Sequence, residues 1–241
     1  MKRTERHHLK ANEVAHWVLG LKDQYEANRT AINYGLLALL VLAVGVFGTM
    51  AWRSMSANRS AAMLAEAMTV AEAPVTAPVA GETGQLPIQP AGTYPSDRAR
   101  FEAALPKFLA VADAHPTAPA GLVARYRAAA ALVALGRADD GIQQYRQVVE
   151  RGSGVIAAMA KLGVADAQLA GGKYDDAVIG LKALADAPGD DVPADGVLMQ
   201  LGRAYRMAGK AADAKKLFQR VVDEFPTSVY ATDAKRELET L

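Results

Sequence analysis

The segment ALVALGRADDGIQQYRQVV, residues 131–149, sets the architecture of the C-terminal half of the chain, because two later segments repeat its pattern. The second copy is AQLAGGKYDDAVIGLKAL, residues 167–184, and the third is AYRMAGKAADAKKLFQRVV, residues 204–222. One glycine aligns in all three copies, at intervals of 36 and 37 residues: Gly136, Gly172 and Gly209. Self-similarity at a fixed period of this size is typical of proteins built from stacked repeats.

Three further positions recur behind each of these glycines. A small residue, a large apolar residue and an aliphatic residue follow at the same offsets: Gly141, Ala177 and Ala214; Tyr145, Leu181 and Phe218; Val148, Leu184 and Val221. The pattern predicts a hairpin of two helices in each copy, with the glycine in the turn after the first helix. The small residue lets the two helices approach closely. A single hairpin cannot bury its apolar stripe alone, so the hairpins are expected to stack.

This register resembles that of the tetratricopeptide repeat. The third copy matches best, with its residues at the family's characteristic positions: Leu201, Gly202, Tyr205, Gly209, Ala214, Phe218, Val221 and Pro226. The second copy departs from the pattern at Gln168, where a tyrosine is expected, and the first departs at Gly141. Phe101–Pro116 looks like the second half of a further repeat. The final helix, with Tyr230, Ala234 and Leu238 facing inward, is predicted to cap the array.

The resemblance therefore implies an all-α fold over residues 96–241, with about 3.5 helical hairpins and a C-terminal cap helix. The chain has 241 residues, and 27 Lys and Arg against 26 Asp and Glu leave a formal net charge of +1. A nucleic-acid-binding protein needs a concentrated basic surface, so no nucleic-acid partner is expected. The absence of cysteine excludes thiol nucleophiles, cysteine-ligated metals and disulfides. No catalytic grouping or phosphate loop is evident, and we predict neither an enzyme nor a cofactor.

A second feature precedes the repeats. Residues 34–52, YGLLALLVLAVGVFGTMAW, contain no charge and as a helix would span about 28 Å, close to the hydrocarbon thickness of a bilayer. Tyr34 and Trp52 bracket the stretch as interfacial aromatic residues. We predict a single transmembrane helix over residues 34–53. A cleaved signal peptide and a buried core helix are the alternatives. The first usually has a shorter apolar region nearer the N-terminus, and the second rarely runs so long without a polar residue.

The distribution of basic residues predicts the orientation of this helix. Six precede it: Lys2, Arg3, Arg6, Lys10, Lys22 and Arg29. Only Arg53 and Arg59 follow it before Arg98. The positive-inside rule therefore places the N-terminus in the cytoplasm, although the counts close to each end of the span are equal.

The segments that flank the apolar stretch complete the predicted organisation. Within residues 1–33, the cytoplasmic tail, five apolar residues recur at helical spacing: Val14, Trp17, Val18, Leu21 and Tyr25. They predict a short amphipathic helix that contacts lipid or protein, the alternative being a solvated tail. Residues 54–95 are expected to be a helical extension that ends at Pro74, followed by an extended linker rich in proline and glycine. Residues 96–241 form the predicted periplasmic repeat domain.

This layout resembles the ancillary SecYEG translocon subunit family of Gram-negative inner membranes. Its members are anchored tetratricopeptide proteins with a periplasmic repeat domain, associated with the translocon and with an anchored prolyl-isomerase-like chaperone. The resemblance implies that the chain is a bitopic inner-membrane scaffold. Its expected partners are translocon subunits, a periplasmic chaperone or unfolded segments. The alternative is an assembly or docking subunit of another cell-envelope or respiratory complex. The sequence does not indicate an oligomeric state.

Tetratricopeptide arrays bind partner segments along the face formed by the first helices of the hairpins. The groove-facing offsets of the family fall on eight residues of this chain: Tyr126, Met159, Leu162, Asp166, Met199, Arg203, Arg206 and Met207. Methionine and tyrosine provide adaptable apolar contacts, and the arginines are candidates to bind carboxylates or backbone carbonyls. For each position the alternative is packing or plain exposure to solvent.

Overall fold

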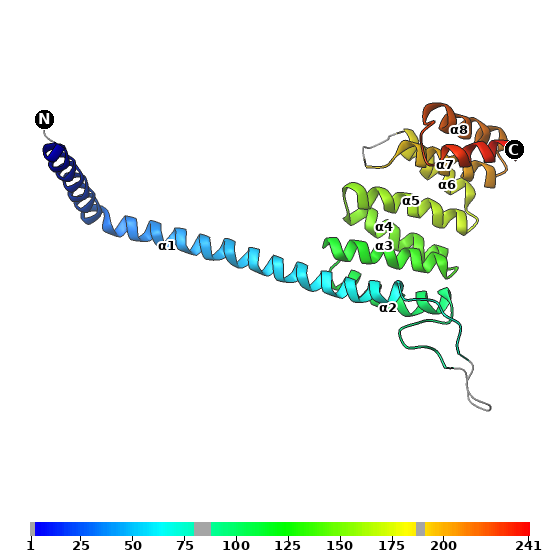
Figure 1. Ribbon diagram of the computed structural model, residues 1–241, viewed down its shortest axis with the longest axis horizontal. Coiled ribbons are helices and arrows are strands. Elements are labelled where there is room, and N and C mark those ends of the chain that lie inside the picture. The colour runs from blue at the N-terminus through cyan, green and yellow to red at the C-terminus, as the bar shows by residue number, and fades with distance from the viewer. Residues whose placement is uncertain (1–2, 80–87, 187–190) are drawn as a thin grey trace. The chain divides into compact units, whose positions relative to one another are not determined.

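The computed structural model describes residues 3–79, 88–186 and 191–241, with side chains from Asn28 onward. The described residues form helices joined by short turns (Figure 1). Their bounds are α1 Arg3–Ala71, α2 Asp97–Ala114, α3 Pro119–Ala134, α4 Ala138–Arg151, α5 Gly154–Ala170, α6 Tyr174–Asp186, α7 Ala194–Met207, α8 Ala211–Glu224 and α9 Ala231–Glu239. The chain divides into two compact units, residues 1–56 and 57–241.

Helices α2 to α8 stack in chain order within the second unit (Figure 1). The predicted hairpins are therefore confirmed as α3/α4, α5/α6 and α7/α8. Each hairpin turns at its aligned glycine with a left-handed φ, +80° at Gly136, +73° at Gly172 and +75° at Gly209. In the third hairpin the amide of Lys210 donates to the carbonyl of Tyr205 at 2.8 Å, which satisfies a carbonyl at the end of α7.

The recurring side chains behind each glycine form the contacts expected of them. Gly141 is buried, and a Cβ added there would lie 2.7 Å from the side chain of Val133, so only a small residue fits between α3 and α4. Phe218 is fully buried, and a Cβ at Gly202 would lie 2.6 Å from its ring. Burial of a side chain as large as phenylalanine contributes about 2–3 kcal/mol to stability. The repeat is thus held by matched small and large residues on facing helices.

The second unit begins earlier than the sequence indicates. The expected boundary is residue 96, but residues 57–71 of α1 pack against α2 and complete the first hairpin. Ala67 is fully buried in this cluster, next to the core that Phe108 forms. Lys107 of α2 also donates to the carboxylate of Glu66 at 2.6 Å. The segment expected as a helical extension is therefore the first helix of the array.

The segment after Pro74 is more ordered than an extended linker. The amide of Thr76 donates to the carbonyl of Tyr94 at 2.9 Å, and the amide of Tyr94 donates to Pro74 at 3.0 Å. Farther along, Val79 and Ile88 form a reciprocal antiparallel bridge. The two sides of the segment thus pair, and the chain returns to α2 close to where it left α1. Its described part is an insertion within the first hairpin, and does not act as a spacer ahead of the repeats.

Polar contacts link successive hairpins. Lys173 donates to Asp139 of the preceding hairpin at 2.6 Å, and Lys210 donates to Asp175 at 2.7 Å. In the second and third hairpins, the basic residue after the turn glycine thus contacts the first turn of the second helix one repeat earlier, whereas Arg137 of the first hairpin pairs with Asp140 of its own helix. These aspartates also lie in the first turns of α4 and α6, where negative charge interacts favourably with the helix dipole. Arg125 adds a buried link, donating to Asp113 and to Gln144, at 2.7 Å each.

The first unit contains the long apolar part of α1. The helix runs from Arg3 with one interruption, Asn28, whose backbone lies outside the helical region at φ −121° and ψ 18°. The amphipathic pattern predicted for residues 14–25 falls in this helix, but its side chains lie outside the described residues. Between Asn28 and Ala71, α1 is long and apolar enough to cross a membrane, and none of its most apolar window is buried. A signal sequence near an N-terminus also passes this test of length and composition.

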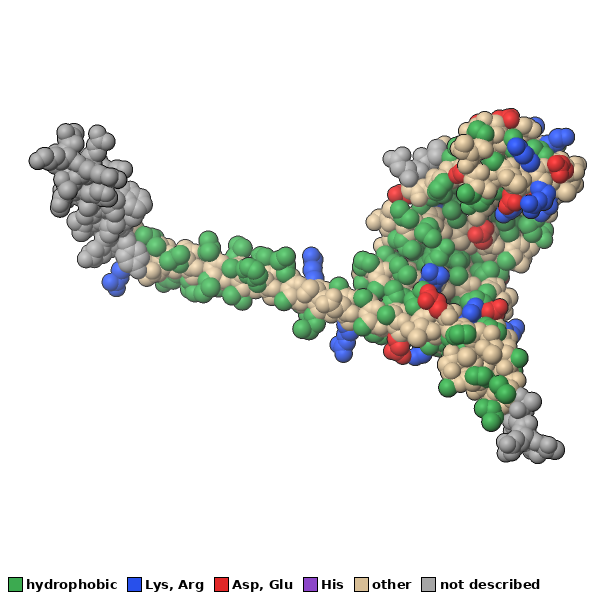
Figure 2. All heavy atoms as spheres, in the orientation of Figure 1, with side chains coloured by type: hydrophobic (Ala, Val, Ile, Leu, Met, Phe, Trp, Pro, Cys, Tyr) green, Lys and Arg blue, Asp and Glu red, His purple; other side chains and the backbone are tan. Residues whose placement is uncertain are grey.

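Nearly all side chains along residues 34–52 are exposed, and Figure 2 shows the apolar side chains on the visible face of the helix. Tyr34 is 69% exposed and Trp52 73%, with large aliphatic residues similarly exposed between them. A helix that is apolar all round and unburied does not match a core helix of this unit. The buried core-helix alternative is therefore excluded for these residues.

Candidate functional site

The candidate site is the face that α3, α5 and α7 present, each being the first helix of its hairpin. We call it the first-helix face and define it by Tyr126 on α3, Met159, Leu162 and Asp166 on α5, and Arg203, Arg206 and Met207 on α7. Residues three, four or seven apart share one side of a helix, so the residues from α5 and from α7 each form a row. Side-chain chemistry changes along this face from apolar and acidic to basic.

Tyr126 lies at the α3 end of the face. Its ring meets that of Tyr145 from α4 edge-on, with centroids 5.1 Å apart and an interplanar angle of 66°. Burial raises the pKa of both phenols, and the negative charge of Asp166 adds to the effect. Both tyrosines therefore stay neutral at physiological pH. Tyr126 is half-buried, and offers a partner one edge of a fixed aromatic ring.

Asp166 lies in the middle of the face. Burial raises the pKa of its carboxyl, while the Gln200 amide and the charge of Arg203 act in the opposite direction. The Gln200 amide approaches the carboxylate from α7 at 3.5 Å, a long hydrogen bond. Neighbouring groups thus desolvate the carboxylate in part, although the side chain stays exposed to solvent. A cationic group from a partner can therefore reach it, and water screens part of the attraction.

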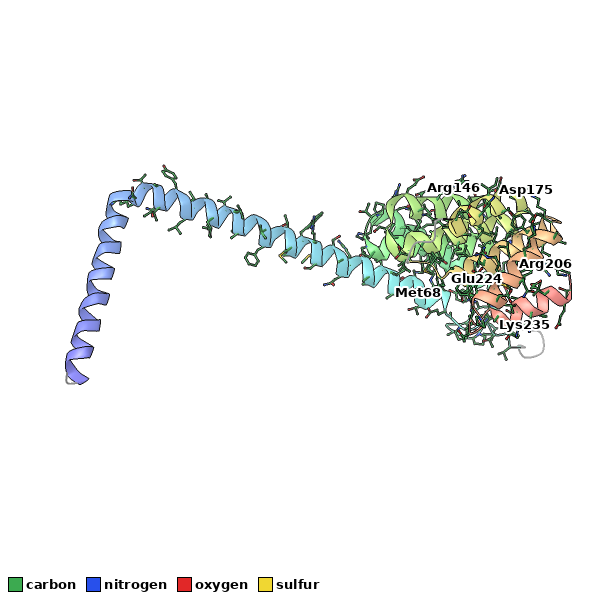
Figure 3. The ribbon with its side chains drawn as sticks, turned by 90° about the horizontal axis from the view of Figure 1, so that it is seen from above. Met68, Arg146, Asp175, Arg206, Glu224 and Lys235 are labelled. Carbon is green, nitrogen blue, oxygen red and sulfur yellow. The ribbon has the colours of Figure 1, made fainter. Side chains whose placement is uncertain are left out.

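The two arginines already have carboxylate partners in the chain itself. Arg206 contacts Glu237 of α9 at 2.8 Å, and Arg203 lies 3.7 Å from both Glu237 and Asp233. Figure 3 shows Arg206 in the C-terminal part of the repeat unit, where α9 ends the stack. The prediction that these arginines bind carboxylates or carbonyls of a partner stays a prediction, since the contacts seen are with the cap helix. A partner segment would have to displace α9 contacts to use them.

Met199 is not a surface residue. It is fully buried in the last core cluster with Phe218 and Ala234, so its placement in the groove was wrong. The cap helix α9 covers Met199. The equivalent residues on α3 and α5, Tyr126 and Leu162, have no such cover and are half-exposed. The remaining apolar members do reach the surface. Met159 is 42% exposed, Met207 is 43% exposed and Leu162 is half-buried.

The open part of the first-helix face therefore consists of Tyr126, Met159, Leu162, Asp166 and Met207. It combines apolar contacts with one partly desolvated carboxylate, which suits recognition of a polypeptide more than bond-making chemistry. Among the described residues no group of three His, Asp or Glu side chains is placed to hold a metal ion. The sequence did not predict the roles of Gln200, Asp233 and Glu237. For Gln200 the available signal was its position three residues before Arg203, on the same side of α7. Asp233 and Glu237 lie on the cap helix, for which the groove offsets give no position.

Comparison with known proteins agrees with this geometry. Two tetratricopeptide repeat models match the chain, one over residues 126–191 and one over residues 197–228. The matched residues coincide with α3 to α8, so this part of the chain carries tetratricopeptide repeats. Tetratricopeptide repeats are in general protein-interaction scaffolds, and no enzyme family matches.

Solved structures of similar form include the TPR-like repeats of a kinesin light chain from Podosopora anserina. They are 18% identical, with a TM-score of 0.49, and the match covers 58% of this chain and 77% of theirs. A single-residue variant of the same repeats gives the same identity and TM-score, with 76% of its length covered. No curated protein has a significant match to the sequence.

Proposed function

We propose that the chain is a bitopic inner-membrane scaffold whose repeats bind polypeptides in the periplasm, as an accessory of the Sec translocon and its chaperones. Residues 34–53 are its membrane anchor and the N-terminus is cytoplasmic. The observation that carries the proposal is the combination of an unburied apolar helix with a tetratricopeptide array on one chain. The assignment to the translocon depends on the resemblance of the whole layout to the ancillary SecYEG subunits.

The mechanism is tethering. An anchored binding face is confined to a thin layer beside the membrane, which raises its effective concentration for any chain that emerges there. The repeats then need only modest affinity for each segment. The adaptable thioether of Met159 and the aliphatic side chain of Leu162 suit such contacts, because they fit segments of varied sequence.

The charge on the first-helix face favours one kind of segment. Arg203 and Arg206 are paired with α9, whereas Asp166 retains a partly desolvated carboxylate without a strong cationic partner. The proposed ligand is therefore a segment with apolar side chains around one lysine or arginine. Asp166→Asn should weaken its binding while leaving the repeat domain folded. Burial disfavours the charged form of the Asp166 carboxyl, and asparagine carries no charge. The free energy of unfolding should therefore not fall.

Site-directed photocrosslinking in the native membrane tests this function. A photoreactive residue at Met159 is expected to capture translocon subunits, a periplasmic chaperone or nascent exported chains. The matched control is Val229, which is 85% exposed but lies in the turn before α9. Capture at Met159 that is absent at Val229, and that Asp166→Asn weakens, supports the proposal.

Two results would count against it. Recovery of neither translocon subunits nor periplasmic chaperones from Met159 would remove the assignment to secretion. Recovery of a stoichiometric complex unrelated to secretion would favour the alternative, a docking subunit of another envelope or respiratory complex. The two results are distinguished by the identity of the crosslinked proteins.

A further inference from the structure

A hollow of about 400 Å³ lies between α4 and α6, with α5 as its floor. Its volume falls within the range of binding pockets for small ligands and peptide side chains. Residues of all three helices line it: Arg146, Val149, Glu150, Lys161, Val164, Gly180, Ala183 and Leu184. We call it the outer pocket, because it uses the side of α5 opposite to the side that carries the first-helix face.

Helix geometry separates the two sites. Successive residues of an α-helix are rotated by about 100°, so Lys161 and Val164 point roughly opposite to Met159 and Asp166 on α5. A ligand in the outer pocket would therefore leave the first-helix face free. The inference goes beyond the function proposed above and does not depend on it.

The outer pocket exists because the second repeat has smaller residues than the third at equivalent positions. With the turn glycines Gly172 and Gly209 aligned, Gln168 corresponds to Tyr205 and Gly180 to Leu217. Tyr205 and Leu217 both pack against the third and fourth core clusters and fill the junction between the last two hairpins. A Cβ added at Gly180 would have the Gln168 side chain 4.0 Å away as its nearest neighbour. The second repeat thus leaves open the space that the third fills.

The chemistry of the lining indicates the ligand. Val149, Val164 and Leu184 supply apolar surface, and the polar atoms lie on the rim. Arg146 and Lys161 are the rim cations, and Glu150 is its one carboxylate. Within the described residues none of the three makes a hydrogen bond or ion pair with another side chain, and Figure 3 shows Arg146 on the outside of the repeat unit. The rim therefore carries a net positive charge that the chain itself does not neutralise.

We propose that the outer pocket binds a peptide segment in which a large apolar side chain is flanked by carboxylates. The apolar side chain enters the space beside Gly180, where it is removed from water by Val164 and Leu184. The flanking carboxylates meet Arg146 and Lys161 on the rim, as charge complementarity requires. The chain thus has a second polypeptide site, whose charge preference is opposite to that of Asp166.

Isothermal titration calorimetry on the full-length protein in detergent micelles tests the proposal. The probe is the acetylated, amidated peptide Gly-Glu-Leu-Phe-Glu-Gly. Two matched peptides serve as controls, one with lysine in place of both glutamates and one with alanine in place of leucine and phenylalanine. The acidic peptide is expected to bind, and each control peptide to bind at least about tenfold more weakly.

Variants locate the binding. Gly180→Trp fills the pocket and should weaken binding at least about tenfold, whereas Gly180→Ala leaves most of the space and should stay within about twofold. Arg146→Glu and Lys161→Glu alter exposed side chains, so they test the rim even if Gly180→Trp does not fold. Each variant is expected to weaken binding of the acidic peptide about tenfold.

Three outcomes would overturn the proposal. The first is equal binding of the acidic and lysine peptides, and the second is an affinity unchanged by both Gly180→Trp and the rim variants. The third is self-association of the protein that Gly180→Trp abolishes, which would show that a second copy occupies the pocket. Each leaves the proposal for the first-helix face untouched, because Met159 and Asp166 are unaltered in every variant.

Discussion

Residues 34–52 and the helices of the repeats both carry many apolar side chains, but the two regions distribute and expose them differently. Along residues 34–52 the large apolar residues face solvent all round, as Leu42 does at 69% exposed. In the repeats the apolar residues alternate with charged ones and are buried on one side of the helix, as Leu181 and Phe218 are. The two patterns thus suit two different surroundings. Uniform apolarity suits lipid, and periodic apolarity suits a partner helix.

The largest effect is expected on membrane insertion, when charge is introduced into residues 34–52. A charged residue at the centre of a membrane helix costs about 2.5–3.5 kcal/mol, so Leu42→Arg combined with Val46→Arg should prevent stable insertion. The measurement is the fraction of full-length protein that stays with membranes after alkaline carbonate extraction. The control is Ile179→Arg, an exposed position in α6 that should leave that fraction unchanged. Equal retention of both variants would show that residues 34–52 are not the anchor.

In the periodic region the largest effect is expected at a fully buried ring. Phe218→Ala removes the side chain that packs on Gly202 and should lower the free energy of unfolding by about 3–5 kcal/mol. Thermal and urea unfolding followed by circular dichroism would measure it. The control Phe225→Ala alters a half-buried ring of the same cluster and should cost less. A smaller loss at Phe218 than at Phe225 would contradict the packing described here.

A smaller effect is expected at the turns. Gly209 has φ +75°, so Gly209→Ala places a Cβ in the left-handed region and should cost about 1–2 kcal/mol. Gly180 lies inside α6 with open space around it, so Gly180→Ala should be neutral or stabilising by up to about 1 kcal/mol. Opposite signs for two identical substitutions are measurable by urea unfolding. Equal effects would refute the distinction between turn and helix glycines.

The smallest effect is expected for the ion pairs between hairpins. Lys210 and Asp175 are both exposed, so Lys210→Ala should cost no more than about 1 kcal/mol. The loss should shrink as salt is raised, because exposed charges are screened. Lys235→Ala is the control, since Lys235 is exposed and makes no ion pair among the described residues. A salt-independent loss at Lys210 would show that the side chain acts through packing instead.

The sequence predicted the parts of the fold that repeat. The turn glycines, the small residues facing large ones and the inward side of α9 were all predicted, because each follows from local geometry at a fixed period. Residues 57–71 were missed as the first helix of the array because the insertion after Pro74 breaks that period. Periodicity alone could not find the partner of Glu66, which is Lys107 of α2.

The candidate site was predicted less completely, for a physical reason. Offsets along a helix give the side on which a residue lies, but they do not indicate what covers that side. Met199 occupies a groove-facing position in the repeat register but is buried, because α9 packs over the end of the stack. Arg206 also occupies such a position, but it forms an ion pair with Glu237 of the same cap helix. Both differences arise at the last repeat, where the cap takes the place of a further hairpin.

The central claim is that residues 34–53 hold the repeat unit outside the cytoplasm. Protease added to intact spheroplasts, followed by detection of tags at both ends, tests it most directly. The account predicts that residues 57–241 are degraded, while an N-terminal fragment survives and remains with the membrane after a high-salt wash. A C-terminal portion that survives the protease, together with release of the intact chain by salt, would contradict it.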